Sequence, residues 1–191
     1  MKHPFFTIGH SNRSLTDFVD ILEGAGVAFV VDVRTVPRSR TNPQYNHDVL
    51  PESLAAFGIG YDHIASLGGL RGRDRNVPAD VNAFWQNTSF HNYADYAMGG
   101  DFRAGLDRLL EHGRRQRSAI MCAEAVWWRC HRRIIADYLL VAGEDVFHLM
   151  GPGRVQPASL TAAACAAGSG VLTYPPARPP DGIPHAPRGG E

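Results

Sequence analysis

Residues 121–133 carry most of the side chains in this chain that could do chemistry. The segment reads Met-Cys-Ala-Glu-Ala-Val-Trp-Trp-Arg-Cys-His-Arg-Arg. A short apolar run at residues 118–122 leads into it, and apolar residues then recur from residue 134 at the three- and four-residue spacing typical of a helix face. The segment is therefore predicted to join a strand to a helix N-terminus, where free backbone N–H groups and the arginines at 129, 132 and 133 could hold an anion.

Three side chains of this segment are the candidate catalytic residues: Cys122, Glu124 and His131. A thiolate of Cys122 facing a helix N-terminus would be nucleophilic, although a buried structural cysteine is the alternative. Glu124 could act as a general acid or base, or as a nucleophile in glycosyl transfer, and the alternative is an ion pair with Arg34 or Arg132. His131, in the first helical turn, suits either proton transfer or contact with an anion.

A metal site is a further possibility for the same residues. Catalytic zinc needs three protein ligands and an open position, and acceptable ligands are present in Cys122, Cys130, His131, His10 and His63. Their spacing matches none of the short paired-ligand patterns. We therefore expect no cofactor, with zinc at His10, Cys122, Cys130 and His131 as the alternative.

The elements that must position these side chains alternate along the chain. Strands are predicted at residues 5–8, 27–33, 58–64, 118–122 and 145–149, and helices at 14–24, 48–57, 90–98, 101–115, 130–142 and 157–167. The run 27–33 is continuously apolar and β-branched up to Asp32, which predicts a central strand buried on both faces. The pattern predicts an α/β fold, a three-layer domain around a mainly parallel sheet at residues 1–167. Residues 168–191, rich in Pro and Gly, are predicted to be a mobile tail.

Polar side chains follow each predicted parallel strand and should converge on one edge of the sheet. In open α/β sheets, ligands bind outside the carboxyl ends of the strands. Arginine side chains and backbone N–H groups gathered there could surround a phosphate or carboxylate. The two tryptophans of the segment could stack on a nucleobase or sugar, and packing into the core is the alternative. The candidate ligand-binding residues are His10, Ser11, Arg34, Arg38, Gly68, Gly69, Arg71, Trp128, Cys130 and Arg132.

Composition limits the partners of such a site. The chain has 19 Lys and Arg against 19 Asp and Glu, so its formal net charge of zero gives no general field for nucleic acid or an anionic membrane. Three unevenly spaced cysteines do not form a disulfide framework, and no apolar run suits a signal peptide or membrane span. We expect a cytoplasmic, reduced protein that has no membrane partner.

Several motifs resemble those of a bacterial family, domain of unknown function 488, to which the YeaO-like proteins belong. The resemblance covers about residues 5–148 in order and implies a cytosolic α/β domain with a shared set of candidate site residues, without a settled activity. The residues that carry it are Thr7-Ile8-Gly9-His10-Ser11, Asp32-Val33-Arg34 with Pro37 and Ser39, Gly58-Ile59 with Tyr61, Leu67-Gly68-Gly69, Cys122-Ala123-Glu124 and Cys130-His131-Arg132.

Two functions remain open on the sequence. The leading hypothesis is an enzyme, a hydrolase or transferase, that clamps a small anionic or nucleotide-like substrate with arginines and a helix N-terminus. The alternative is a non-enzymatic module that binds nucleic acid or a protein through the same arginines, and the neutral net charge disfavours nucleic acid. The sequence does not indicate an oligomeric state.

Overall fold

The main sheet has six strands in the order β3-β2-β4-β1-β5-β6. In this computed structural model, which describes residues 2–168 and 170–176, five strands run parallel and the last pairs antiparallel with its neighbour. The strands are β1 (Phe5–Gly9), β2 (Phe29–Asp32), β3 (Gly60–His63), β4 (Ser118–Cys122), β5 (Val146–Gly151) and β6 (Arg154–Pro157). The mainly parallel α/β sheet predicted from the alternation of elements is confirmed.

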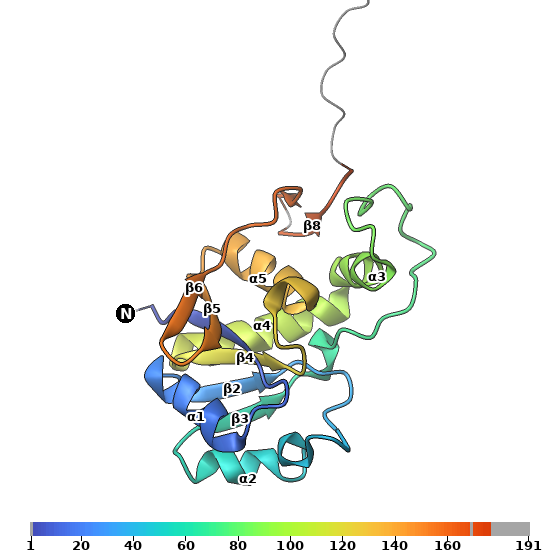
Figure 1. Ribbon diagram of the computed structural model, residues 1–191. Helices are drawn as coiled ribbons and strands as arrows, with labels where there is room; N and C mark the ends of the chain where they lie inside the picture. Colours follow the sequence, from blue (N-terminus) through green and yellow to red (C-terminus); the bar gives the residue numbers. More distant parts are fainter. Residues whose placement is uncertain (1, 169, 177–191) are drawn as a thin grey trace, which may run out of the picture.

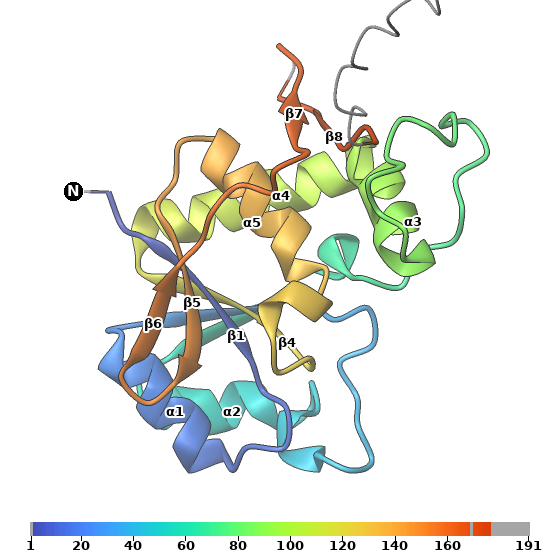
Figure 2. The same ribbon diagram turned by 45° about the horizontal axis from the view of Figure 1, so that its top comes forward.

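Helices cover both faces of the sheet and complete a three-layer domain. Figure 1 shows α1 (Leu15–Gly24) and α2 (Leu50–Ala55) below the sheet, with α4 (Gly100–Arg115) and α5 (Arg132–Val141) above it. In Figure 2, α3 (Thr88–Ala97) lies beside α4, on the side toward which β4 points. Short 3-10 turns occur at Pro43–Tyr45, Ala65–Leu67 and Trp127–Arg129. Among the residues described, no helix combines the length and apolarity that a bilayer crossing requires.

Two apolar clusters join the sheet to its helices. On one face, Phe18 and Leu22 of α1 and Leu54 of α2 pack against the inner strands. On the other, Leu106 of α4 and Ile135 of α5 belong to a larger cluster. The helices form where expected because apolar residues recur at helical spacing, and α1 begins where Ser14 Oγ accepts a hydrogen bond from the backbone N–H of Asp17.

The strand predicted to be central is not central. β2 lies second from one edge, between β3 and β4, whereas β4 and β1 occupy the middle of the sheet. An uninterrupted β-branched run reports burial on both faces, and a strand one place in from the edge is also covered on both faces. The run therefore predicted burial correctly but not the position of the strand.

The predicted helix at residues 157–167 is also wrong. Pro157 ends the fully exposed strand β6, and the short strand β7 (Cys165–Ala166) pairs antiparallel with β8 (Leu172–Thr173). The alanines of this segment have helix propensity but form no amphipathic face that the core could bury.

Residues within the predicted tail are packed into the core. Leu172 and Tyr174 are fully buried, and the Tyr174 hydroxyl donates to Asp137 Oδ2 at 3.0 Å. The packed core thus includes residues past 168, and residues 177–191 lie outside the described residues.

Candidate functional site

The carboxyl edge of the parallel sheet brings the polar loops together. The backbone N–H of His10, after β1, donates to the carbonyl of Cys122 at 2.9 Å. The N–H of Val33, after β2, donates to Met121 at 3.0 Å, so the loops that follow β1 and β2 flank the end of β4. The strand order makes the loops of neighbouring strands lead in different directions at this edge. Such a point is the usual place for a ligand in an open α/β sheet.

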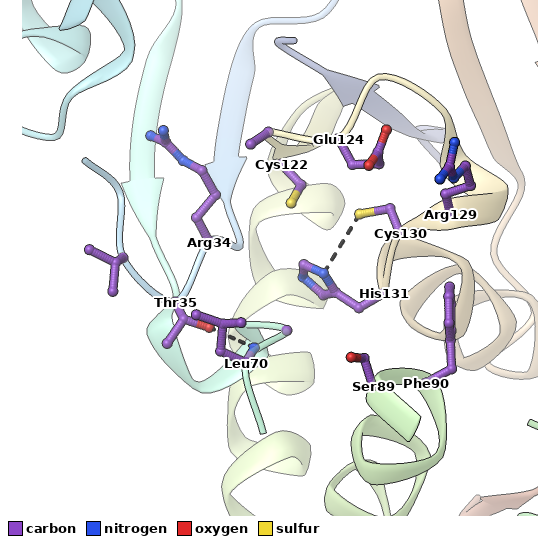
Figure 3. A pocket seen from close by; sticks show the side chains of 13 residues that line it. Arg34, Thr35, Leu70, Ser89, Phe90, Cys122, Glu124, Arg129, Cys130 and His131 are labelled. Carbon is purple, nitrogen blue, oxygen red and sulfur yellow. Dashed lines mark hydrogen bonds between the residues drawn. The ribbon is translucent and has the colours of Figure 1, made fainter. Parts of the chain in front are cut away.

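A cavity of about 310 Å³ opens at this edge, and we call it the rim pocket. It is formed by the loops after β2, β3 and β4 together with the start of α3, as Figure 3 shows. Its volume suits a small molecule. The lining residues are Arg34, Thr35, Val36, Gly69, Leu70, Ser89, Phe90, Cys122, Ala123, Glu124, Arg129, Cys130 and His131.

Two sulfur atoms and an imidazole form one cluster in the wall of this pocket. The ligand atoms of Cys122, Cys130 and His131 all lie within 4.8 Å of one another. Cys130 Sγ is 3.6 Å from His131 Nδ1, the contact drawn in Figure 3. Cys122 ends β4, whereas Cys130 and His131 immediately precede α5, so the sheet and the helix start fix the two halves of the cluster.

The two thiols of the cluster differ in character. A hydrogen bond to Cys130, together with burial, holds the pKa of the Cys122 thiol well above its usual value. Burial alone would raise the pKa of Cys130 too, but the hydrogen bond from Cys122 and the neighbouring charges of Arg132 and His131 outweigh it and hold that pKa well below its usual value. The lowered pKa thus belongs to Cys130, whereas the sequence had drawn attention to Cys122.

The orientation of His131 is fixed by the backbone. Its Nε2 atom lies 3.0 Å from the carbonyl oxygen of Val33, which can only accept, so Nε2 carries the proton. In the neutral ring, Nδ1 then keeps its lone pair on the side facing the sulfur atoms. Gly69 packs against the ring, and the edge of the ring meets Tyr93 at a centroid distance of 5.0 Å.

Arg34, predicted to bind an anion, is committed to an internal ion pair. Its guanidinium contacts buried Asp32 through Nε at 2.9 Å and Nη2 at 2.5 Å, and Nη2 also donates to the carbonyl of Tyr45. In Figure 3 the guanidinium points away from the sulfur atoms. Its side chain lines the pocket, but its hydrogen bonds are made to Asp32 and Tyr45 within the protein.

The other predicted arginines also make internal contacts or lie elsewhere. Arg71 donates to the carbonyls of Gly68 and Ala65. Arg132 is buried, and its Nε donates to Cys130 Sγ at 3.2 Å while Nη2 donates to the carbonyl of Glu124 at 2.6 Å. Arg38 is exposed and does not line the rim pocket.

Arg129 and Glu124 remain available to a ligand. Both side chains are exposed and line the rim pocket, and neither has a hydrogen bond or ion pair from its charged group within the described residues. The alternative ion pair of Glu124 with Arg34 or Arg132 is absent there, because Arg132 contacts only its backbone carbonyl. The pocket thus has one unpaired cation and one unpaired carboxylate.

The remaining predicted residues support the loops around the pocket. His10 is buried, bonds Ser11 O through Nδ1 at 2.8 Å, and has its Nε2 3.3 Å from Arg34 Nη1, so both ring nitrogens are engaged. Ser11 itself adopts a positive φ of 50° in the turn after β1. Gly68 allows close approach of Thr35, and Trp128 is 47% exposed beside the pocket without lining it.

Sequence reasoning missed much of the apolar lining. Leu70 is 76% exposed and Val36 is 62% exposed, and both flank the opening. Ser89 and Phe90 come from the start of α3, which follows a segment without periodicity, so no pattern linked them to the sheet edge. The unusual exposure of two aliphatic side chains beside a cavity is itself typical of a ligand site.

Comparison with known proteins gives one match. A family model described as Domain of unknown function DUF488 matches residues 14–139. No curated protein and no solved structure matches this chain.

Proposed function

This chain belongs to the family described as Domain of unknown function DUF488, and we propose that it is an enzyme, a hydrolase or transferase, acting on a small anionic molecule bound in the rim pocket. One observation carries the proposal: the wall of a small-molecule cavity contains two cysteines and a histidine with their reactive atoms in one cluster. Reactive groups that converge in a well-formed pocket are a usual mark of an active site.

The lining indicates what kind of substrate fits. Val36, Leu70 and Phe90 offer apolar contact, and the exposed aliphatic groups lose water when a ligand covers them. Arg129 provides a guanidinium that can pair with a phosphate or carboxylate at the opening. A partly apolar molecule with one anionic group matches this distribution.

Glu124 is suited to proton transfer. Its carboxylate has no partner within the described part of the chain and lines the same pocket as the cluster. In a hydrolysis, water gives a proton to Glu124 as its oxygen bonds to the electrophilic atom, the bond to the leaving group breaks, and Glu124 returns the proton to that group. In a transfer, an acceptor hydroxyl replaces water.

The arginines give less support to nucleic-acid binding. Three of the four arginines that would form a basic surface use their guanidinium groups on protein atoms: Arg34, Arg71 and Arg132. With a net charge of zero, little positive charge remains to neutralise a series of phosphates.

The enzyme proposal is tested with the purified full chain and a panel of nitrophenyl esters that carry acyl or phosphoryl groups. We expect turnover that falls at least about a hundredfold in Glu124→Gln, as is typical when a general base is lost. The matched control is Glu111→Gln, an exposed glutamate on α4, which should keep full activity. Turnover that is unaffected by Glu124→Gln and by Cys130→Ser would contradict the assignment.

Arg129 allows the substrate class to be tested separately. Arg129→Gln should raise KM for anionic esters about tenfold and leave KM for neutral esters unchanged, because one charge-assisted contact contributes roughly 1.5 kcal/mol. Arg114→Gln, an exposed arginine near the end of α4, is the control. An equal effect on both ester types would argue against anion recognition by Arg129.

A further inference from the structure

We propose that Cys122, Cys130 and His131 bind a zinc ion whose fourth coordination position opens into the rim pocket. Within the described residues these three form the group of metal-ligating side chains whose ligand atoms converge. The binding can be tested by itself, and the chemistry at the ion rests on the proposed function. Two thiolates and an imidazole are ligands that select zinc over magnesium or calcium.

Distances within the cluster agree with tetrahedral zinc. A Zn–S bond of about 2.3 Å and a Zn–N bond of about 2.0 Å at a tetrahedral angle separate the sulfur and nitrogen atoms by roughly 3.5 Å. Cys130 Sγ and His131 Nδ1 are 3.6 Å apart. The other two separations in the cluster are at most 4.8 Å, so each would have to shorten by no more than about 1.3 Å to reach the distances of such a site.

The surroundings of His131 provide an independent reason. Histidines that bind metals through one nitrogen usually donate the other N–H to a carbonyl or carboxylate, which fixes the tautomer. His131 has this arrangement, because its Nε2 faces the carbonyl of Val33 at 3.0 Å and its Nδ1 faces the sulfurs, 3.6 Å from Cys130 Sγ. The backbone therefore holds the ring in the form that a cation requires.

The position of the three ligands beside the rim pocket indicates a catalytic rather than a structural zinc ion. Structural zinc sites have four protein ligands, whereas catalytic sites have three and keep one position open. His10, the fourth residue of the zinc alternative, has both ring nitrogens engaged by Ser11 and Arg34 and is not in the cluster. Three ligands beside a cavity that also contains Glu124 match the open type.

The position of Glu124 relative to Cys122 suits proton transfer at a zinc site. In zinc deaminases, a glutamate two residues after a metal ligand transfers protons without binding the metal. Glu124 stands two residues after Cys122 and lines the pocket. Water in the open position would become more acidic, so that Glu124 can take its proton near neutral pH.

The test uses the purified full chain, stripped with a chelator and titrated with zinc chloride or cobalt chloride alone. We expect one bound ion per chain, with the thiolate-to-cobalt absorption of a sulfur-ligated site. Cys122→Ser and His131→Gln should each weaken zinc binding at least tenfold. Cys165→Ser, which removes the exposed cysteine in β7, is the matched control and should bind as the unaltered chain does.

The possible outcomes separate this proposal from the proposed function. Circular dichroism establishes that each variant is folded before its affinity is compared. An unaltered chain that binds zinc no more tightly than Cys122→Ser overturns the metal site, as does a Cys122–Cys130 disulfide that forms in place of metal binding. Hydrolysis that persists in the stripped chain would support the proposed function and contradict a catalytic role for zinc. Zinc binding without any turnover would support the metal site and contradict the proposed function.

Discussion

Gly69 lies so close to the imidazole of His131 that a Cβ atom at position 69 would be 2.4 Å from Nδ1. The ring cannot yield freely, because its other nitrogen is bound to the carbonyl of Val33. The loop after β3 thus determines where one member of the cluster lies, although it contributes no reactive group itself.

Gly69→Ala should therefore destabilise the chain and displace His131. Forcing a methyl group into a packed site costs about 1–3 kcal/mol. Gly72→Ala, in the same loop but with no atom within 4 Å of the added carbon, should change stability by less than about 0.5 kcal/mol. Urea unfolding measures both. Equal stabilities of the two variants would show that the Gly69–His131 contact is not tight in solution.

Asp32→Asn should be strongly destabilising. Asp32 is fully buried, pairs with Arg34 and accepts the hydroxyl of Tyr61 at 2.8 Å. Removing one partner of a buried ion pair costs about 3–5 kcal/mol because the other charge stays buried and unpaired.

The matched control for Asp32→Asn is Asp62→Asn. Asp62 is partly buried and pairs with the exposed side chain of Arg108 and with His112, so its loss should cost less than that of Asp32, about 1–2 kcal/mol. Similar midpoints of urea unfolding for the two variants would be inconsistent with a special role for the buried pair.

His148 should make the fold less stable in mild acid. Burial, with a smaller contribution from the charge of Arg132, lowers its pKa to about 4. The unfolded chain takes up a proton near the ordinary value of about 6.5, whereas the folded chain does not. The free energy of unfolding should therefore fall as the pH drops from 6.5 to 4, with no further contribution from this group below pH 4.

Unfolding of His148→Gln at pH 7 and pH 4.5 measures this effect. Between the two pH values, His148→Gln should lose less stability than the unaltered chain does. The control, His3→Gln, should lose as much stability as the unaltered chain. His10, whose pKa burial also lowers to about 4, leaves a residual dependence of the same sign in every variant. If His148→Gln kept the full pH dependence of stability, His148 would not be its cause.

Tyr174→Ala should show that the chain beyond residue 168 belongs to the folded unit. Tyr174 is fully buried, stacks edge-on against Trp85 and donates to Asp137. Removing a large buried aromatic side chain costs about 3–5 kcal/mol. Val155→Ala, at a half-exposed position on β6, should stay within about 0.5 kcal/mol. Indistinguishable thermal midpoints would mean that residues 170–176 do not stabilise the core.

Much of the fold could be predicted because the spacing of apolar residues along the sequence reflects which side chains are buried. The alternation of β-branched runs and amphipathic segments predicted the parallel strands and helices α1, α4 and α5. Parallel strands deliver their following loops to one edge, so the neighbourhood of His10, Val33 and Cys122 followed from topology alone.

Details of the site depended on contacts that no local pattern encodes. The arginines were expected to hold an anion, but Asp32, the carbonyl of Gly68 and the sulfur of Cys130 take up their hydrogen bonds. The lowered pKa belongs to Cys130 and not to Cys122, because the hydrogen bond from Cys122 and the nearby Arg132 and His131 act on the second sulfur. Such pairings arise from side-chain geometry in three dimensions.

The segment after residue 153 shows another limit of sequence patterns. Alanine-rich composition favoured a helix at residues 157–167, but the chain forms the end of β6, a turn and the start of the β7–β8 hairpin there. Proline and glycine near residues 168–191 suggested a tail, although Leu172 and Tyr174 are held by long-range packing. Composition averaged over a segment overlooks two buried side chains that anchor it.

The two ends of the loop between β4 and α5 are anchored differently from its middle. Cys122 is the last residue of a strand paired on both sides, and Cys130 precedes a helix whose backbone it helps to begin. Residues 123–129 form the loop between these fixed points and carry the exposed side chains of Glu124 and Arg129. Exchanging this stretch for another of equal length would replace both the arginine that meets an anionic group and the proposed proton-transfer residue, while Cys122 and Cys130 would keep their places at the ends of the loop. Variation within this one loop can therefore alter ligand selection and proton transfer together, on an unchanged pair of cysteines.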